Sequence, residues 1–559
     1  MKSLREYFSI YRYIIRLIPL FFVLTLVFPA CSILDELLND DESSERQFWA
    51  IDSEDNLYQL EAHVAAESDY CKIWVEKGIG LDPKTIQKVI NEYEKNIRPT
   101  MLKNFSIEGT IIDPETNQNV GDNILDYADY LTDGDRKLSI LILDIPSEDE
   151  FTYVAGYFWS NNFYEKSYSK YSNECDLIYL NSILLEKDPS ESYTTLAHEL
   201  QHLMNFSTTL YTRFTYDGGG NITDFNEMDL WIDEGLSAAA EWVYSGQHSQ
   251  ERLDQFNDMP GETYKSSGMP KSIIHYGNNF FVWGEEPDYI LDEYATVYIF
   301  FQWLRLQTKP NGSKIEDGAE IYKEIIASKE YNHEAVVNAV KGKGNYAGDA
   351  NLQWETLLRD WLVANALVES DLTKNINKKY SYMDDPDLSD LMVYTVPVSG
   401  GLDLYPGEGI YSGTSSAGLT SSYTSGSGPN IKYVGANLDT KNVSNTNTYA
   451  DGILITYNTS TLRFDYEDEN SDDLLEWGKV ASINYYGSPI SSINVKNNVK
   501  KNTSPIIAQA QTKSKTTDKL FKPQAISMGD MLRKNGHKDF GLKKSGLKKP
   551  IFKKARKDK

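Results

Sequence analysis

A helix that carries two histidines one turn apart is the feature that most limits how this chain can fold. Residues 194–205 read TTLAHELQHLMN. Apolar residues recur along one stripe of the predicted helix: Leu196, Leu200, Leu203 and Met204. His198 and His202 share one face, where two imidazoles can bind a single tetrahedral Zn²⁺. Glu199 lies beside them and is placed to remove a proton from a bound water.

A catalytic zinc needs a third protein ligand, and the segment WIDEGLSAAAE at 231–241 offers one. Glu234 falls near the start of an Ala-rich predicted helix, 32 residues after His202. Carboxylates are also favoured at helix N-termini by the helix dipole, which gives this Glu an ordinary structural explanation. Its pairing with an upstream H-E-x-x-H motif favours the interpretation as a ligand.

Two segments together resemble the zinc peptidases whose third ligand is glutamate, the gluzincins, and most of all the hyicolysin family of bacterial secreted metallopeptidases. They are AHELQHLMNF (197–206) and WIDEGLSAAAE (231–241). Three further stretches are similar: VAGYFWSNNFY (154–164), YSNECDLIYLN (171–181) and YTTLAHELQH (193–202). The resemblance covers roughly residues 50–370. It implies an α+β, zincin-like catalytic domain, in which a sheet and the active-site helix precede a helical subdomain.

The resemblance also implies a role for each residue of the motif. His198, His202 and Glu234 are expected to hold one catalytic Zn²⁺, and Glu199 is expected to act as the base. The chain has no Gly-Ala-Met-Glu-Asn motif, with which aminopeptidases hold the amino terminus of a substrate. That difference favours an endopeptidase.

The chain departs from related enzymes in two ways, of which the first concerns the groups that support the histidines. Thermolysin-type enzymes carry an Asp four residues beyond the third ligand, where this chain has Ala238. The gap between His202 and Glu234 is also longer than in aminopeptidases of this type. Metal-binding histidines need a carboxylate or carbonyl on their second ring nitrogen. Asp233 and Glu241 are the candidates.

The predicted site also needs a hydrogen-bond donor for the negatively charged transition state. Tyr294 lies in the predicted helix DEYATVYIFFQWL (292–304) and resembles the catalytic Tyr of aminopeptidase-type gluzincins. Tyr298 and His275 are alternatives. A packing role for Tyr294 is also open, because the chain has 38 Tyr.

The first residues read as a targeting segment rather than as part of the fold. Basic residues precede an apolar stretch at 17–27, and Ala30 stands directly before Cys31. This order resembles a bacterial lipoprotein signal and predicts an exported protein, lipidated on Cys31 and anchored to a membrane, in the periplasm or at the cell surface. A plain cleaved signal or an uncleaved anchor is the alternative.

Charge is distributed unevenly along the chain. The net charge is −27, yet residues 496–559 contain 19 Lys and Arg against 4 Asp and Glu. The acidic body argues against nucleic acid as a partner of the folded part. The basic tail is expected to be disordered, although contacts with anionic lipid, an acidic polymer or the body are open.

The order of predicted elements divides the chain into five parts. We expect a signal peptide at 1–30, an acidic tether at 31–50, the catalytic domain at 51–380, a small β-rich domain at 381–498 and the basic tail at 499–559. Within the catalytic domain, the nearly continuous apolar run LSILILDI (138–145) predicts a central strand. Cys71 and Cys175 remain after the signal, and a disulfide or two buried thiols are both open.

The function predicted from these features is that of a zinc-dependent endopeptidase that acts on proteins or peptides. Two alternatives stay open. One is a lipid-anchored binding protein or adhesin on a degenerate peptidase scaffold, and the other is a zinc hydrolase of a non-peptide bond. The many acidic loops leave a structural calcium open, but no D-x-D-x-D-G loop ending in Glu supports one. The oligomeric state is not predicted.

Overall fold

The computed structural model describes residues 45–461 with gaps, of which 258–279 is the longest, and two short strands at 482–485 and 520–522. The predicted signal peptide, Cys31 and most of the predicted tether therefore lie outside the described residues. So does most of the basic tail. In the described part of the chain, no helix combines the length and the apolar character needed to cross a bilayer.

A six-stranded sheet forms the N-terminal half of the fold, in the order β1-β2-β3-β6-β9-β8. Its middle strands, β3, β6 and β9, run parallel, and the other pairs are antiparallel. The run LSILILDI forms β6, whose six residues are all buried, which confirms the predicted central strand. The strands are β1 (Glu45–Ile51), β2 (Leu57–Glu67), β3 (Cys71–Glu76), β6 (Leu138–Leu143), β8 (Gly156–Phe158) and β9 (Leu177–Asn181).

The sheet curls, so that its first strand, β1, approaches the last strand, β8. The backbone N–H of Ile51 donates to the Tyr157 hydroxyl (2.9 Å), and the N–H of Trp49 donates to Oδ1 of Asn173 (2.8 Å). A separate hydrophobic cluster fills the inside of the curl, while the outer face packs against helices. Strand β1 begins at Glu45, inside the segment predicted as a tether. Its side chains Phe48 and Ala50 are buried in the curl.

Helices cover the outer face of the sheet. Helix α2 (Pro83–Glu92) is continued by a π-helical turn at Tyr93–Ile97 (η2) and by α3 (Arg98–Phe105). The chain stays helical past Pro99, because the wider turn before it accommodates a residue that lacks an N–H donor. Shorter elements complete this half: β4 (Ile111–Ile112), β5 (Asn119–Gly121), α4 (Ile124–Leu131) and α5 (Ser182–Lys187).

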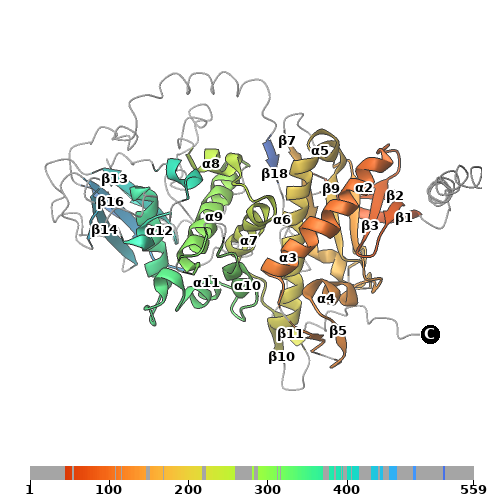
Figure 1. The fold of residues 1–559 in the computed structure, drawn as a ribbon, viewed down its shortest axis with the longest axis horizontal. Coiled ribbons are helices and arrows are strands. Elements are labelled where there is room, and N and C mark those ends of the chain that lie inside the picture. Colours follow the sequence, from red (N-terminus) through yellow and green to blue (C-terminus); the bar gives the residue numbers. More distant parts are fainter. Residues whose placement is uncertain are drawn as a thin grey trace, which may run out of the picture.

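Helix α6 (Pro189–Thr212) runs through the middle of the molecule, between the sheet and the remaining helices (Figure 1). Asp188 caps its N-terminus by accepting from the N–H of Glu191, and Pro189 occupies the first position, where no N–H donor is needed. Because α6 is covered from both sides, most of its residues are buried, well beyond the predicted apolar stripe.

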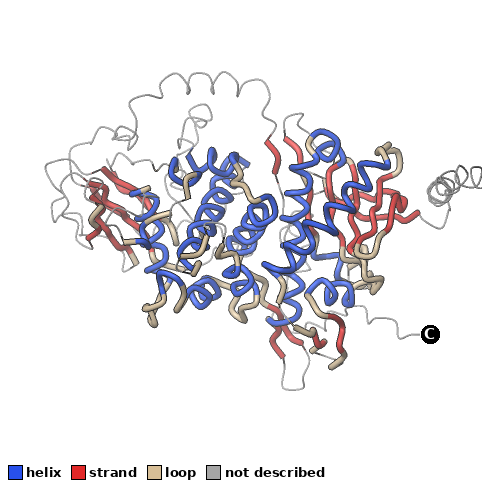
Figure 2. The backbone as a smooth tube through the Cα atoms, in the orientation of Figure 1, coloured by secondary structure: helices blue, strands red, loops and turns tan. Residues whose placement is uncertain are grey.

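The second half of the described chain is mainly helical (Figure 2). Helix α7 (Leu230–Ser245) packs against α6 and ends at Gly246, which adopts the left-handed conformation (φ 69°). At Gly235 an added Cβ would lie 2.4 Å from the Phe301 ring, so α7 and α9 approach closely there. The other helices are α8 (Gln250–Asn257), α9 (Pro287–Thr308), α10 (Glu320–Ile326), α11 (His333–Val340) and α12 (Trp354–Leu367).

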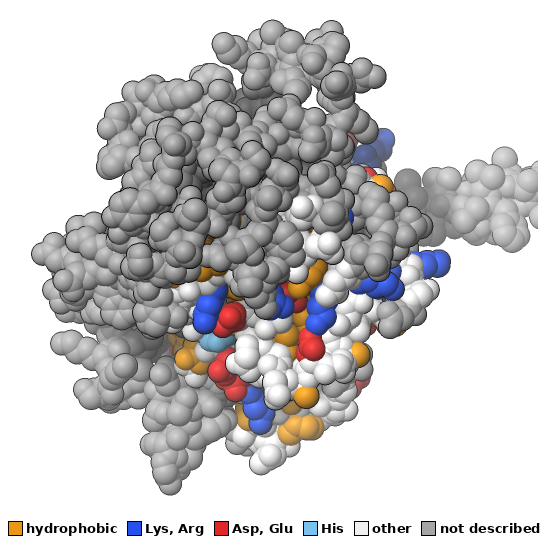
Figure 3. All heavy atoms as spheres, turned by 90° about the vertical axis from the view of Figure 1, so that its left-hand side faces the viewer, with side chains coloured by type: hydrophobic (Ala, Val, Ile, Leu, Met, Phe, Trp, Pro, Cys, Tyr) orange, Lys and Arg blue, Asp and Glu red, His pale blue; other side chains and the backbone are white. Residues whose placement is uncertain are grey.

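A small sheet follows the helices, as the composition after residue 380 predicts. Its order is β13-β16-β14-β15, and its buried residues belong to the same hydrophobic cluster as α12. Figure 3 views this end and shows acidic and basic side chains interspersed on the coloured surface. The strands are β13 (Gly409–Gly413), β14 (Ile431–Asn437), β15 (Val443–Ser444) and β16 (Gly452–Asn458), with β12 (Gly400–Asp403) paired to β17 (Ser482–Tyr485) and β10 (Phe214–Tyr216) to β11 (Ile222–Phe225).

Two further observations bear on the predicted tail and cysteines. Strand β18 (Leu520–Lys522) lies within the predicted tail and pairs in parallel with β7 (Thr152–Val154). An edge strand offers unpaired backbone groups that a further strand can use. Cys71 and Cys175 are free buried thiols that belong to the clusters on opposite faces of the sheet.

Candidate metal centre

Helix α6 brings both predicted histidine ligands to one buried point. His198 and Glu199 are fully buried and His202 is nearly so. The two imidazole rings lie 4.9 Å apart, and their Nε2 atoms are separated by 3.2 Å. This arrangement is the one expected from a spacing of four residues on a helix.

Glu234 reaches the same point from α7. Its carboxylate is buried, and its Oε2 atom lies 3.5 Å from Nε2 of His198 and 3.5 Å from Nε2 of His202. It is the fifth residue of α7, and its side chain faces the histidines rather than the unpaired N–H groups of the helix end. A favourable interaction with the helix dipole therefore does not by itself explain the position of Glu234.

The three converging atoms fit the geometry of a zinc site. Two ligands of a tetrahedral zinc at 2.0–2.1 Å are about 3.3 Å apart, and the three separations here are 3.2, 3.5 and 3.5 Å. Oε2 of Glu234 is buried and makes no hydrogen bond of good geometry within the described part of the chain. A buried carboxylate in this position requires a compensating positive charge. Two imidazoles and one carboxylate are a donor set that suits Zn²⁺.

The electrostatics of the cluster favour positive charge. Burial alone lowers the pKa of His198, but the neighbouring carboxylates of Glu234 and Glu241 outweigh burial and raise that pKa to about 9. Burial raises the pKa of Glu234, yet the neighbouring His202 and His198 lower it to about 2. The same carboxylates that hold protons on the imidazoles attract a divalent cation, which must displace those protons.

The two carboxylates predicted to support the histidines are in place. Nδ1 of His198 lies 2.8 Å from Oε1 of Glu241, and Nδ1 of His202 lies 2.9 Å from Oδ2 of Asp233. Each carboxylate can accept the Nδ1 proton, which leaves Nε2 of the ring free to bind a metal.

These contacts predict a loss of metal affinity when either carboxylate is neutralised. We expect Asp233→Asn and Glu241→Gln each to weaken zinc binding by about 10–100-fold, because an amide no longer fixes the tautomer of the histidine. Zinc competition with a chromophoric chelator measures the change. Asp254→Asn, on the next helix, is a control that should leave zinc affinity unchanged. Unaltered affinity in both variants would contradict the supporting role.

The carboxylate of Glu199 accepts a hydrogen bond from β8, the edge strand of the sheet. The N–H of Phe158 in β8 donates to its Oε2 at 2.8 Å, and its Oε1 is buried without a hydrogen bond from the described residues. Burial raises the pKa of Glu199 to about 7, which is the range of a general base at neutral pH. No sequence pattern indicates the Phe158 contact, because any residue other than proline at that position supplies the same backbone N–H.

The structure separates the alternatives for the transition-state donor. The Tyr298 hydroxyl is already engaged by Nδ1 of His248 (2.8 Å) and by the N–H of Ser249 (3.3 Å). Tyr294 is buried, and its pKa is raised by burial and by the nearby charges of Glu234 and Glu199, which places it beside the metal residues. His275 lies outside the described residues.

Arg252 of α8 is a member of the site that sequence reasoning missed. Its guanidinium is buried, lies 3.2 Å from Oε1 of Glu241 and is stacked 4.9 Å from the centre of the Tyr294 ring. It thus contacts both the carboxylate that orients His198 and the candidate donor. An isolated Arg in a short polar helix carries no recognisable pattern, so only the tertiary structure identifies it.

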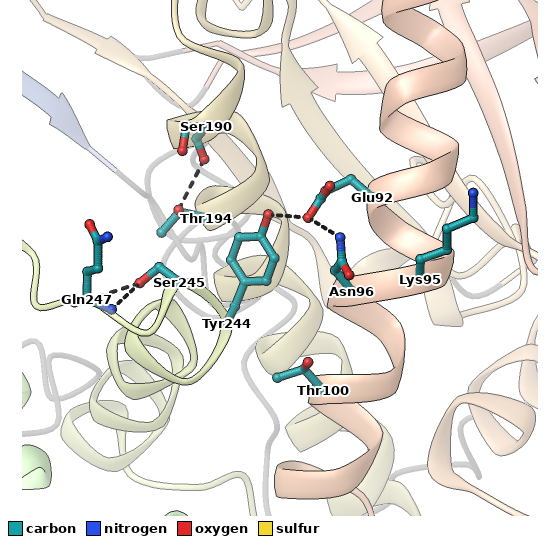
Figure 4. Close-up of a pocket in the computed structure, with 9 residues that line it drawn as sticks. All are labelled: Glu92, Lys95, Asn96, Thr100, Ser190, Thr194, Tyr244, Ser245 and Gln247. Carbon is teal, nitrogen blue, oxygen red and sulfur yellow. Dashed lines mark hydrogen bonds between the residues drawn. The ribbon is translucent and has the colours of Figure 1, made fainter. Parts of the chain in front are cut away.

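A pocket of about 400 Å³ lies between the start of α6, the end of α7 and the helical segment from α2 to α3 (Figure 4). The Tyr244 hydroxyl and the Asn96 side-chain amide both donate to Oε1 of Glu92 at 2.8 Å within it. The lining is polar and contains none of the predicted metal ligands. It consists of Glu92, Lys95, Asn96, Thr100, Ser190, Thr194, Tyr244, Ser245 and Gln247.

Comparison with known proteins gives one informative similarity. No family model matches the chain. A stretch of 216 residues is 29% identical to the neutral metalloprotease ShpI of Staphylococcus hyicus, and the match covers 37% of this chain and 42% of that protein. The chain therefore spans less than half the length of the relative it matches. This similarity supports a metalloprotease function at a coarse level and implies a bound metal.

Proposed function

We propose that the protein is a zinc-dependent endopeptidase of the gluzincin type, related to the hyicolysin family. The observation that carries the proposal is the convergence of His198, His202 and Glu234 on one point, with Glu199 beside it. The partial similarity to a neutral metalloprotease supports the same reaction. The substrates are proteins or peptides.

In the proposed mechanism, His198, His202 and Glu234 hold the metal, and Glu199 handles the proton. A zinc ion bound there supplies an activated water and polarises the scissile carbonyl. Oε1 of Glu199 accepts the water proton and later delivers it to the leaving amine, while the Phe158 N–H keeps Oε2 in place. The Tyr294 hydroxyl donates a hydrogen bond to the negative oxygen that develops.

The edge of the sheet supports cleavage within a chain rather than at its end. Strand β8 is the last strand of the sheet, and the Phe158 N–H points from it toward Glu199. An extended peptide can pair with such an edge and pass the site in both directions. We therefore expect internal bonds to be cut, in agreement with the missing motif for a substrate amino terminus.

Export and lipid anchoring are part of the proposal. The basic residues, the apolar stretch at 17–27 and the Ala30–Cys31 pair support a lipoprotein that is held on a membrane through Cys31. The membrane contact would then be made by the lipid and would leave the described body free to meet its substrates.

The decisive experiment uses residues 32–559, purified and assayed on an unfolded protein substrate. We expect cleavage that a chelator abolishes and that zinc restores. Cleavage products should include internal fragments on mass spectrometry. Cleavage that survives complete removal of metal would overturn the proposal. A protein that neither binds zinc nor cleaves would instead favour a lipid-anchored binding protein on a peptidase scaffold.

A further inference from the structure

A second group of carboxylates gathers at the end of α4 and in the loop that leads from it to β6, away from the residues of the metal centre. Asp129, Asp133 and Asp135 each place one carboxylate oxygen within 4.8 Å of the others. Three like charges at such distances repel one another. Positive charge near these carboxylates lowers that repulsion.

A fourth carboxylate, that of Asp176, lies behind this loop at the start of β9. The N–H of Ser139 donates to the Asp176 carbonyl (3.0 Å), which sets Asp176 beside the start of β6, where the loop ends. The side chain is 2% exposed, and its Oδ1 has no hydrogen-bond partner among the described residues. A buried, unpartnered carboxylate oxygen costs free energy unless a cation or proton compensates it.

The charges of the three carboxylates act on Asp176. Burial is the main cause that raises its pKa well above the usual range, and the next causes are the charges of Asp133, Asp129 and Asp135. The backbone contact with Ser139 and these neighbouring charges both place Asp176 near the cluster. We therefore count Asp176 as the buried member of the same cluster.

The charges near the cluster leave it with an excess of negative charge. Nζ of Lys72 lies 2.5 Å from Oδ2 of Asp135, and the Arg46 guanidinium acts on Asp133. Arg136 also acts on Asp129. Four carboxylates thus face three cations, and the cluster keeps an excess of negative charge. The ligand atoms are all oxygens, without a His or Cys in the group.

We propose that Asp129, Asp133 and Asp135, backed by the buried Asp176, form a binding site for one Ca²⁺ ion. Calcium takes oxygen ligands at 2.3–2.6 Å, so two of its ligand atoms are at most about 5 Å apart, in agreement with the separations of up to 4.8 Å here. Mg²⁺ requires a tighter octahedron and gives up its water reluctantly. The site fixes the junction of α4, β6 and β9 and does not depend on the proposed peptidase function.

Calcium titration of the zinc-loaded chain tests the site, with Glu199→Gln as the background to prevent self-cleavage. We expect a Ca²⁺-dependent rise of about 3 °C in the melting temperature at saturation, with calorimetry showing one ion per chain. Mg²⁺ at the same concentration should have a much smaller effect. No Ca²⁺-dependent rise, or an equal rise with Mg²⁺, would overturn the assignment.

Substitutions then locate the ion. Asp176→Asn should be at least as stable as the parent without calcium, because it removes a repelling charge, and it should lose the calcium response. The exposed Asp133→Asn should lose the response too, which keeps the test valid if the buried variant does not fold. Asp122→Asn, before α4, is the matched control and should keep the full response. A calcium response that persists in both cluster variants would refute the site.

Discussion

Replacing Glu199 by glutamine is expected to lower kcat for peptide hydrolysis by about 10²–10⁴-fold, while one zinc ion per chain remains bound. Glutamine has the same shape, and its amide oxygen can still accept the N–H of Phe158, which now bonds Oε2 at 2.8 Å. An amide cannot take a proton from water, so the chemical step fails without a change in fold. Steady-state kinetics and metal analysis on the same preparation measure both effects.

The control for this substitution stands on the same helix. Glu191→Gln makes the same change of charge two turns before His198, at a residue that is not among the converging metal residues. It should keep most of the activity. Full turnover by Glu199→Gln would remove Glu199 from the mechanism, whereas loss of both zinc and activity would show that this residue supports the metal site instead of moving protons.

The local geometry of the site was predictable because side-chain directions recur regularly along a helix. A spacing of four residues places His198 and His202 on one face whatever surrounds them. The carboxylates at Asp233 and Glu241 lie on one helix with Glu234, so a motif that brings Glu234 to the metal also brings them within reach of the histidines. The sequence pattern and the tertiary contact are here consequences of the same periodicity.

Contacts between distant elements were not predictable. The Phe158 N–H reaches Glu199 across 41 residues, and Arg252 reaches Glu241 from a helix without any apolar pattern. The first contact is made by a backbone group, which carries no residue identity. The second depends on how α7, α8 and α9 pack. Neither leaves a local trace in the sequence.

The same distinction holds for the fold. Strand β6 is buried on both faces, so its residues form a nearly continuous apolar run, which predicts a central strand. Strand β1 is mixed in character, because only the side that faces the inside of the curl is buried, and it was assigned to the tether. The pairing of β18 with β7 joins segments far apart in the sequence, so local composition does not predict it.

The second large effect is expected for Tyr294→Phe, which should lower kcat/KM by about 10²–10³-fold with zinc affinity unchanged. The substitution removes one hydroxyl beside Glu234 and Glu199 and keeps the ring on which Arg252 is stacked. A donor that acts only on the developing negative oxygen lowers kcat and leaves KM nearly constant. Kinetics with a fluorogenic peptide separate the two parameters.

Tyr298→Phe is the matched variant, one helical turn further along α9. Its hydroxyl bonds His248 and Ser249, so its loss should lower the free energy of unfolding by about 1 kcal/mol and leave kcat unchanged. Urea unfolding measures the first effect and the peptide assay the second. If Tyr294→Phe retains full activity, Tyr294 is a packing residue, and the donor must come from elsewhere. His275 is then the next candidate, and His275→Ala should show the loss that Tyr294→Phe does not.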